Sequence, residues 1–156
     1  MRRVLVLLAF IAGVAMAAPA PVLRLTSSAG SLDLPLALDG GYTSGYRQSI
    51  YGVPVFETER AVAGRIAIVR ARSSDRRSLE YYRWGDDIRE IGGAYEQDAP
   101  ANGVDALSIR VTAGGEQWIE SDGVRIDLLV RFGETAIRVV PATTPALAWL
   151  LAHLAR

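Results

Sequence analysis

Hydrophobic and polar residues alternate most regularly in the last third of the chain, with the period of two that is typical of half-buried strands. Apolar residues from Val124 to Phe132 alternate with charged ones. Asp122-Gly123 precedes this run and Gly133-Glu134 follows it, and both dipeptides tolerate the positive φ that two-residue hairpin turns require. We therefore predict an antiparallel meander of four strands, near residues 105–112, 116–121, 124–132 and 135–140.

The register across these turns places apolar pairs on one face of the predicted sheet and charged residues on the other. In the hairpin before Trp118, a glycine bulge in the loop restores that apolar face. The expected cross-strand pairs are Ile119 with Ile126, Glu120 with Arg125, Val130 with Ile137, Leu128 with Val139, and Ile109 with Ile119.

Shorter strands are expected upstream of the meander. The strands that contain Pro35 and Pro54 are disfavoured at central positions of a sheet, because proline has no backbone N–H to donate to a neighbouring strand. The glycine-rich segment Gly40–Gly45 is expected to be a loop. The predicted strands are 22–27, 31–38, 46–58 and 65–72.

Residues 76–91 fit either a helix or a hairpin. Apolar and aromatic residues from Tyr81 to Tyr95 recur at helical spacing, Ser74 or Asp75 can cap the N-terminus, and Gly92-Gly93 can end the helix. A turn at Gly85-Asp86 would instead give a hairpin. We favour the helix and leave the hairpin open.

A second helix is predicted from Thr144 to Arg156, with Thr144 as its cap and a stripe of leucines on one face. Strands, a helix, a meander and a closing helix together predict an α+β fold. In it, one mid-chain and one C-terminal helix pack against an antiparallel sheet.

The N-terminus has the pattern of a signal peptide. Arg2 and Arg3 precede an apolar run from Val4 to Met16, and Ala15-Met16-Ala17 offers small residues for cleavage before Ala18. The run is shorter than the ~20 residues that span a membrane as a helix, which disfavours a retained anchor. We expect a signal peptide at 1–17, a flexible leader at 18–21, a single domain at 22–156, and export to the periplasm or the extracellular space.

Composition excludes several kinds of chemistry. All 17 basic residues are arginine, cysteine is absent, and His153 is the only histidine. The chain therefore lacks the residues for Schiff-base, cysteine-nucleophile and Ser-Lys catalysis, and His153 lies among the leucines of the terminal helix. Removing residues 1–17 takes away two arginines and no acids, leaving 139 residues with 15 arginines and 17 acids, a net charge of −2. That balance gives no case for binding nucleic acid.

No metal or cofactor is expected. One histidine without cysteine cannot form a zinc site. Residues 98–105 resemble a calcium loop in part, but Pro100 and Ile109 occupy positions where ligands are needed.

Carboxylate chemistry remains open on residue type. Two acids about 5–10 Å apart can hydrolyse a glycosidic bond. Surface charge is the simpler explanation for most acids of a soluble domain. The candidates for such a pair are Glu57, Glu59, Asp86, Asp87 and Glu90.

Three tyrosines near the glycine-rich segment give the positive indication of a binding site. Tyr42, Tyr46 and Tyr51, with Arg47 between them, offer apolar rings and hydroxyls suited to a sugar, lipid or peptide. The alternative is that these tyrosines pack within strands, where tyrosine is common.

The order of elements resembles that of PsbP-like domains, which are exported α+β proteins. The resemblance covers about residues 31–156 and uses a strand, a helix starting at Ser78-Leu-Glu-Tyr81, a glycine-containing meander and a leucine-rich closing helix. It implies a binding or assembly role without catalytic residues.

The sequence therefore predicts an exported, non-catalytic domain that binds an envelope protein or a small ligand. Two alternatives are a small carboxylate-dependent glycan hydrolase and a carrier of a hydrophobic ligand.

Overall fold

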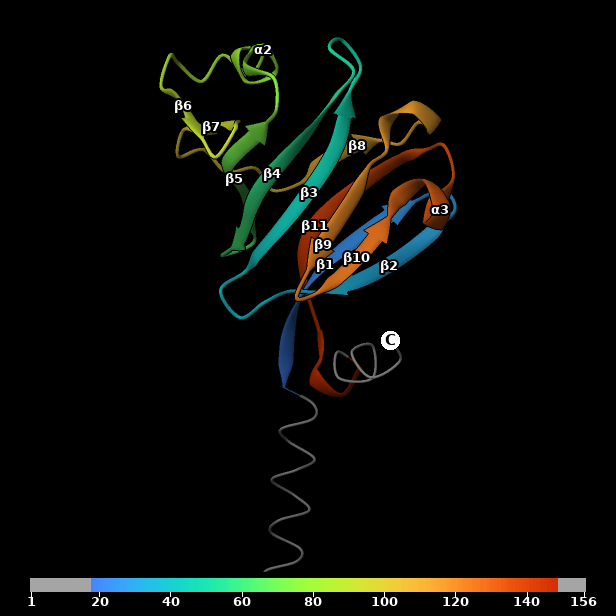
Figure 1. The fold of residues 1–156 in the computed structure, drawn as a ribbon. Coiled ribbons are helices and arrows are strands. Elements are labelled where there is room, and N and C mark those ends of the chain that lie inside the picture. The colour runs from blue at the N-terminus through green and yellow to red at the C-terminus, as the bar shows by residue number, and fades with distance from the viewer. Residues whose placement is uncertain (1–17, 149–156) are drawn as a thin grey trace, which may run out of the picture.

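Two antiparallel sheets make up most of the computed structural model, which describes residues 18–148 (Figure 1). The strand order is β2-β1-β11-β8 in the smaller sheet and β10-β9-β3-β4-β5-β7-β6 in the larger one. The elements are β1 (Pro19–Ser27), β2 (Gly30–Pro35), β3 (Gly41–Gln48), β4 (Val53–Val62), β5 (Arg65–Ser73), α2 (Arg76–Glu80), β6 (Ile88–Ile91), β7 (Ala94–Asp98), β8 (Leu107–Arg110), the 3₁₀ turn η1 (Ala113–Gly115), β9 (Trp118–Ser121), β10 (Val124–Asp127), α3 (Leu128–Phe132) and β11 (Ala136–Pro145).

The hydrophobic core lies between the two sheets. Leu23 and Leu25 alternate with Arg24 along β1, so both leucines face inward, where they join one buried cluster with Tyr42 of β3 and Ile119 of β9. Burial of these apolar side chains supplies the main favourable term for packing the sheets together.

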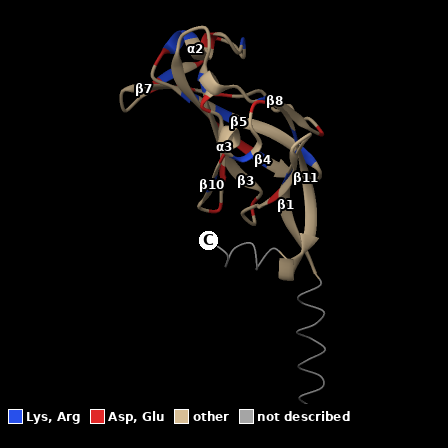
Figure 2. Ribbon diagram, turned by 90° about the vertical axis from the view of Figure 1, so that its right-hand side faces the viewer, with Lys and Arg blue, Asp and Glu red and all other residues tan. Residues whose placement is uncertain are grey.

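The far half of the larger sheet extends beyond this core and carries α2 over β5, β6 and β7 (Figure 1). Acidic and basic residues lie close together around α2 and β7 (Figure 2). Many of them pair with each other: Arg70 and Arg89 both contact Asp98, and Arg76 contacts Glu80 one helical turn later.

The observed fold is richer in strand than predicted, with short helices in place of long ones, so the α+β class holds only loosely. The predicted four-strand meander is wrong. β9 and β10 form the expected hairpin, and the pairs Ile119–Ile126 and Glu120–Arg125 are confirmed. However, β8 and β11 belong to the other sheet and pair with each other, so that Ile109 lies opposite Ile137 rather than Ile119.

A helix in place of a strand explains the broken meander. The Asp127 side chain accepts a hydrogen bond from the Val130 amide at 2.9 Å, which caps α3. Val130 is 85% exposed, so the expected pairs Val130–Ile137 and Leu128–Val139 do not form. A local cap thus overrides the alternating pattern.

The N-terminal strands are partly as expected. β5 confirms the strand at 65–72, and β1 and β2 overlap the strands at 22–27 and 31–38. Residues 19–21 belong to β1 and pair with residues 143–145, so the expected leader is paired strand. Gly40–Gly45 was expected as a loop, but Gly41–Gly45 is the first half of β3, and the predicted strand 46–58 contains the β3–β4 turn.

Residues 76–91 form neither of the two structures considered. The helix stops after Arg76–Glu80, although Asp75 caps it as expected. A hairpin does form, but it turns at Gly92-Gly93, between β6 and β7, and not at Gly85-Asp86. Both turn glycines have positive φ, 60° and 77°, which favours glycine at these positions.

Both ends of the described chain leave from one two-stranded ribbon formed by β1 and β11. Thr144 pairs with Ala20 in this ribbon, and the expected helix begins later than predicted, at residue 146. The Ala146 amide donates to the Ala18 carbonyl at 2.8 Å. Most of the helix expected at 144–156, including His153, and the signal peptide at 1–17 lie outside the described residues. Among residues 18–148, no helix is long and apolar enough to span a membrane.

Candidate functional site

Polar side chains replace apolar ones on the core-facing side of β3 and β4. Tyr42, Ser44 and Tyr46 alternate along β3, and Glu57 and Glu59 alternate along β4 opposite them. Together with Tyr82, these five residues form what we call the tyrosine–glutamate cluster. A β-bulge in the β4–β5 pairing lies beside it, between Thr58 and Glu59. Bulges commonly re-aim side chains next to functional sites.

Glu59 is the most deeply buried acid of the cluster, with 2% of its surface exposed. The Ser44 hydroxyl donates to its Oε1 at 3.0 Å, whereas Oε2 has no hydrogen-bond partner. Burial, reinforced by the charge of Glu57, raises the pKa of Glu59 to about 8. Glu59 is therefore protonated at neutral pH.

The hydroxyls of Tyr46 and Tyr82 form a hydrogen-bonded chain that ends at Glu57. The Tyr82 hydroxyl donates to Glu57 Oε1, and the hydroxyls of Tyr46 and Tyr82 are 2.6 Å apart. Because Tyr82 uses its proton on Glu57, Tyr46 donates to Tyr82. Burial raises the pKa of Tyr46 to about 12 and raises that of Tyr82 further, with help from the charge of Glu57. Glu57 is thus the acceptor at the end of this hydrogen-bonded chain.

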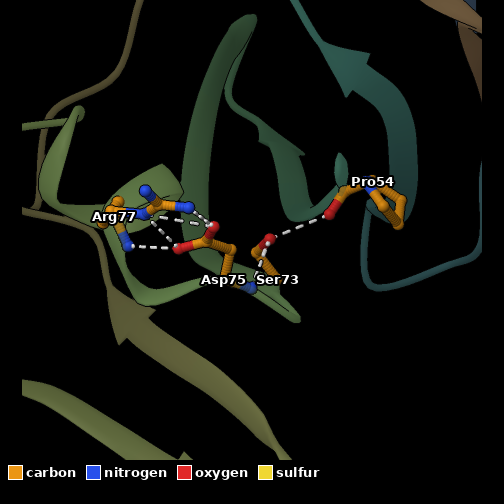
Figure 3. Close-up of polar contacts among 4 residues, drawn as sticks. All are labelled: Pro54, Ser73, Asp75 and Arg77. Atoms are coloured by element: carbon orange, nitrogen blue, oxygen red, sulfur yellow. Dashed lines mark hydrogen bonds and ion pairs between the residues drawn. The ribbon is translucent and has the colours of Figure 1, made fainter. Parts of the chain in front are cut away.

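The short helix α2 holds Tyr82 in place. Figure 3 shows its anchor: the Ser73 hydroxyl donates to the Pro54 carbonyl of β4 at 2.9 Å and accepts from the Asp75 amide at 3.3 Å. Asp75 accepts from the Arg77 amide at 3.0 Å and pairs with its guanidinium at 2.6 Å. Leu79 is fully buried beneath the helix. These hydrogen bonds fix the start of α2 against β4, and α2 in turn positions Tyr82.

The cluster faces a pocket of about 330 Å³ between the sheets, which we call the inter-sheet pocket. Ser44, Tyr46, Glu57 and Glu59 line one side, and β8 lines the other. The volume lies at the lower end of the ~300–1,000 Å³ range of ligand sites. Its apolar lining comes from Leu107, Ile109 and Leu128, and the exposed residues Ser108 and Arg110 also border it.

The structure brings two of the four predicted binding residues together, Tyr42 and Tyr46. Tyr42 is buried, and its hydroxyl lies near Glu59 without a hydrogen bond of its own. Arg47 instead makes a bidentate ion pair with Glu116, both bonds 2.9 Å long, and lines a separate surface hollow. Tyr51 lies in the β3–β4 turn, where the Arg77 guanidinium covers its ring at 5.0 Å.

Of the five candidate acids, likewise, only some lie at the inter-sheet pocket. Glu57 and Glu59 meet in the cluster, whereas Asp86, Asp87 and Glu90 are exposed around the start of β6. Within residues 18–148, no group of three or more acids or histidines could hold a metal ion.

Sequence reasoning missed Ser44 and Tyr82, because the first was placed in a loop and the second within a long helix. A signal for the cluster was present in β4. Val53, Val55, Glu57 and Glu59 follow one another at spacing two, so the face of β4 that carries the buried Val55 also carries two glutamates. Two acids on the core side of a strand call for a specific explanation.

Comparisons with protein-family models, curated proteins and solved structures gave no match for this chain. Two of the elements that carry the resemblance to PsbP-like domains, the long mid-chain helix and the four-strand meander, do not form.

Proposed function

We propose that this chain is an exported binding domain that holds a small molecule, or a small group of a larger partner, in the inter-sheet pocket. The observation that carries the proposal is the pair of acids facing that pocket. Glu59 lines the pocket, and its Oε2 is buried without a hydrogen-bond partner, although buried polar atoms are nearly always satisfied. A bound ligand would supply the missing partner. Support for export comes from the sequence of residues 1–17.

Glycan hydrolysis is the weaker alternative, because both acids lie on the same side of the inter-sheet pocket. Glu57 and Glu59 are two residues apart on β4 and point to one face of the sheet. Glycosidases place an acid on each side of the scissile bond, about 5–10 Å apart, so that the sugar ring lies between them. Nothing on the β8 side of the pocket supplies the second carboxylate.

A carrier of a long hydrophobic ligand also fits less well. The space between the sheets is filled by a continuous buried cluster from β1, β2, β3, β9 and β11. The inter-sheet pocket adds only about 330 Å³, which suits a molecule of roughly a dozen heavy atoms rather than a lipid chain.

A fragment screen by methyl-detected NMR tests the proposal, with protein spanning Ala18 to Arg156. We expect neutral and charged fragments of single-ring size to shift the methyl signals of Leu107, Ile109 and Leu128, which line the pocket. Failure of every fragment to shift these signals at millimolar concentration would refute the proposal.

Two matched variants locate the binding. Ser108 is exposed at the edge of the pocket, so Ser108→Trp narrows the opening without disturbing the core. Ser31 is exposed on β2 and does not border the pocket, so Ser31→Trp is the control. We expect the first variant to lose fragment binding and the second to retain it. Release of reducing sugar ends from cell-wall glycans by the wild-type protein, abolished in Glu57→Gln, would favour the hydrolase instead.

A further inference from the structure

The two carboxyl groups of the cluster have no cationic partner. Among residues 18–148, no arginine forms an ion pair with Glu57 or Glu59, although arginine pairs with acids at ten other places. Arg110 borders the inter-sheet pocket but is exposed. A buried carboxylate without a cationic partner is costly, so a proton on one of the two carboxyl groups lowers that cost.

Burial indicates where that proton resides. Glu59 is 2% exposed, its Oε1 accepts from Ser44 and its Oε2 is left without a partner. Burial and the neighbouring charge of Glu57 both favour the neutral form of Glu59. The pocket thus contains a neutral acid with an unsatisfied oxygen, beside a second acid that accepts from Tyr82.

We propose that the ligand of the inter-sheet pocket carries a protonated amine on an apolar body, and that Glu59 gives up its proton when the amine binds. This inference rests on the proposed function. The Glu59 O–H bond breaks, its proton goes to solvent, and the ammonium N–H groups bond to the carboxylates in its place. No covalent bond forms. One proton leaves as one ammonium enters, so the net charge of the acid pair with its occupant is the same before and after binding.

An organic cation fits this site better than a metal ion. Calcium and magnesium are bound mainly by several carboxylates, whereas only two carboxylates of the described residues line this pocket and the remaining polar side chains are hydroxyls, an amide and an arginine. Leu107, Ile109 and Leu128 provide walls for an apolar body rather than a hydration shell. The Tyr46 ring, also in the lining, favours a cation near its face.

The groups facing Glu59 are Glu57 on its own strand, Tyr42 and Tyr46 on β3, Tyr82 after α2, and Arg110 across the pocket on β8. Burial raises the pKa of all three tyrosines, and that of Tyr46 reaches about 12. Arginine remains charged throughout the accessible pH range. Glu59, whose raised pKa is about 8, is therefore the group of this set whose protonation changes near neutral pH.

The first experiment compares benzylamine, benzyl alcohol and benzoate, which share a ring and differ in charge, in NMR titrations at pH 6.5. We expect benzylamine to bind at least about tenfold more tightly than the other two, because its ammonium makes charge-assisted hydrogen bonds. Glu57→Gln should abolish this preference, and Glu90→Gln, at an exposed site on β6, should preserve it. Equal binding of amine and alcohol would overturn the inference and leave the proposed function standing. Absence of binding by all three would overturn both.

The second experiment measures the proton. Calorimetry of benzylamine binding at pH 6.5, in two buffers with different protonation enthalpies, should show release of about one proton per molecule bound. The release should vanish above pH 9, where Glu59 is already ionised. It should also vanish in Glu59→Gln, which tests the assignment independently of Glu57. Heats that do not depend on the buffer would overturn the proton exchange.

Discussion

The hydroxyl of Tyr82, just beyond α2, donates a hydrogen bond to the carboxylate of Glu57 in the middle of β4. This contact links the lobe around α2 to the central strands of the larger sheet. It also gives Glu57 a hydrogen-bond donor beside Glu59, the other acid that lines the inter-sheet pocket.

Tyr82→Phe should lower the free energy of unfolding by about 1–2 kcal/mol, because it removes a hydrogen bond to a partly buried carboxylate. Chemical denaturation measures the effect. Tyr81→Phe is the matched control, since Tyr81 is exposed and should change stability by less than about 0.5 kcal/mol. Equal effects of the two variants would contradict the role given to Tyr82.

Glu59 should make the protein less stable as the pH rises. Its folded-state pKa of about 8 lies above the ordinary value of 4.5, so the unfolded chain releases this proton first. The stability contribution is therefore fully present below about pH 4.5 and is lost progressively up to about pH 8.

Glu59→Gln isolates this effect, because the amide is neutral throughout. Relative to wild type, the variant should gain roughly 2–4 kcal/mol between pH 5 and pH 8, since one pKa unit corresponds to about 1.4 kcal/mol. Urea denaturation at a series of pH values provides the measurement. Parallel stability profiles for the two proteins would show that Glu59 ionises normally.

Gly45 allows the Trp118 ring to lie against β3. A Cβ at this position would lie 2.4 Å from the ring, where Phe56 also packs and Arg125 stacks at 3.9 Å. Gly45→Ala should cost about 1–3 kcal/mol, because the ring or the strand must move. The near-ultraviolet circular dichroism of the tryptophans should change as well.

Gly114→Ala is the control for this substitution. A Cβ there meets no atom within 4 Å, and the residue has no positive φ, so the change should be close to neutral. If the Gly45→Ala variant is as stable as the Gly114→Ala variant, the contact with Trp118 does not require glycine at position 45.

Ser73→Ala should loosen α2. The substitution leaves the Pro54 carbonyl and the Asp75 amide without their shared hydroxyl, at a side chain that is 1% exposed. We expect a loss of about 1–2 kcal/mol in unfolding free energy. Faster hydrogen exchange in α2 than in β1 would show that the weakening is local. Ser74→Ala, at the exposed neighbour, should have little effect.

Local patterns in the sequence were read correctly where neighbours in the chain also pair in space. The β9–β10 hairpin is the clear case, because one turn sets its register. The alternation from Val124 to Phe132 failed, since Asp127 can cap a helix as readily as it can face solvent in a strand. Alternation shows which residues are half-buried; it does not show which sheet buries them.

Only part of the candidate site could be predicted from the sequence, for a related reason. The candidates from the sequence include Tyr42, Tyr46, Glu57 and Glu59. Their proximity depends on the β3–β4 register, and the sequence pattern predicts a loop for the first half of β3. Tyr82 could not be added, because its contact with Glu57 spans 25 residues and depends on a five-residue helix that propensity alone does not predict.

The pairing of β1 with β11 bears on the order of folding events. The first strand of the domain lies between β2 and the last strand, so the smaller sheet remains incomplete until residues 136–145 have left the ribosome. Such distant pairing slows folding, because a long loop must close before any contact is gained. Without β11, the strands β1 and β2 would lack their link to β8, because β11 lies between β1 and β8. Closure of the smaller sheet is therefore a late step that the larger sheet does not require.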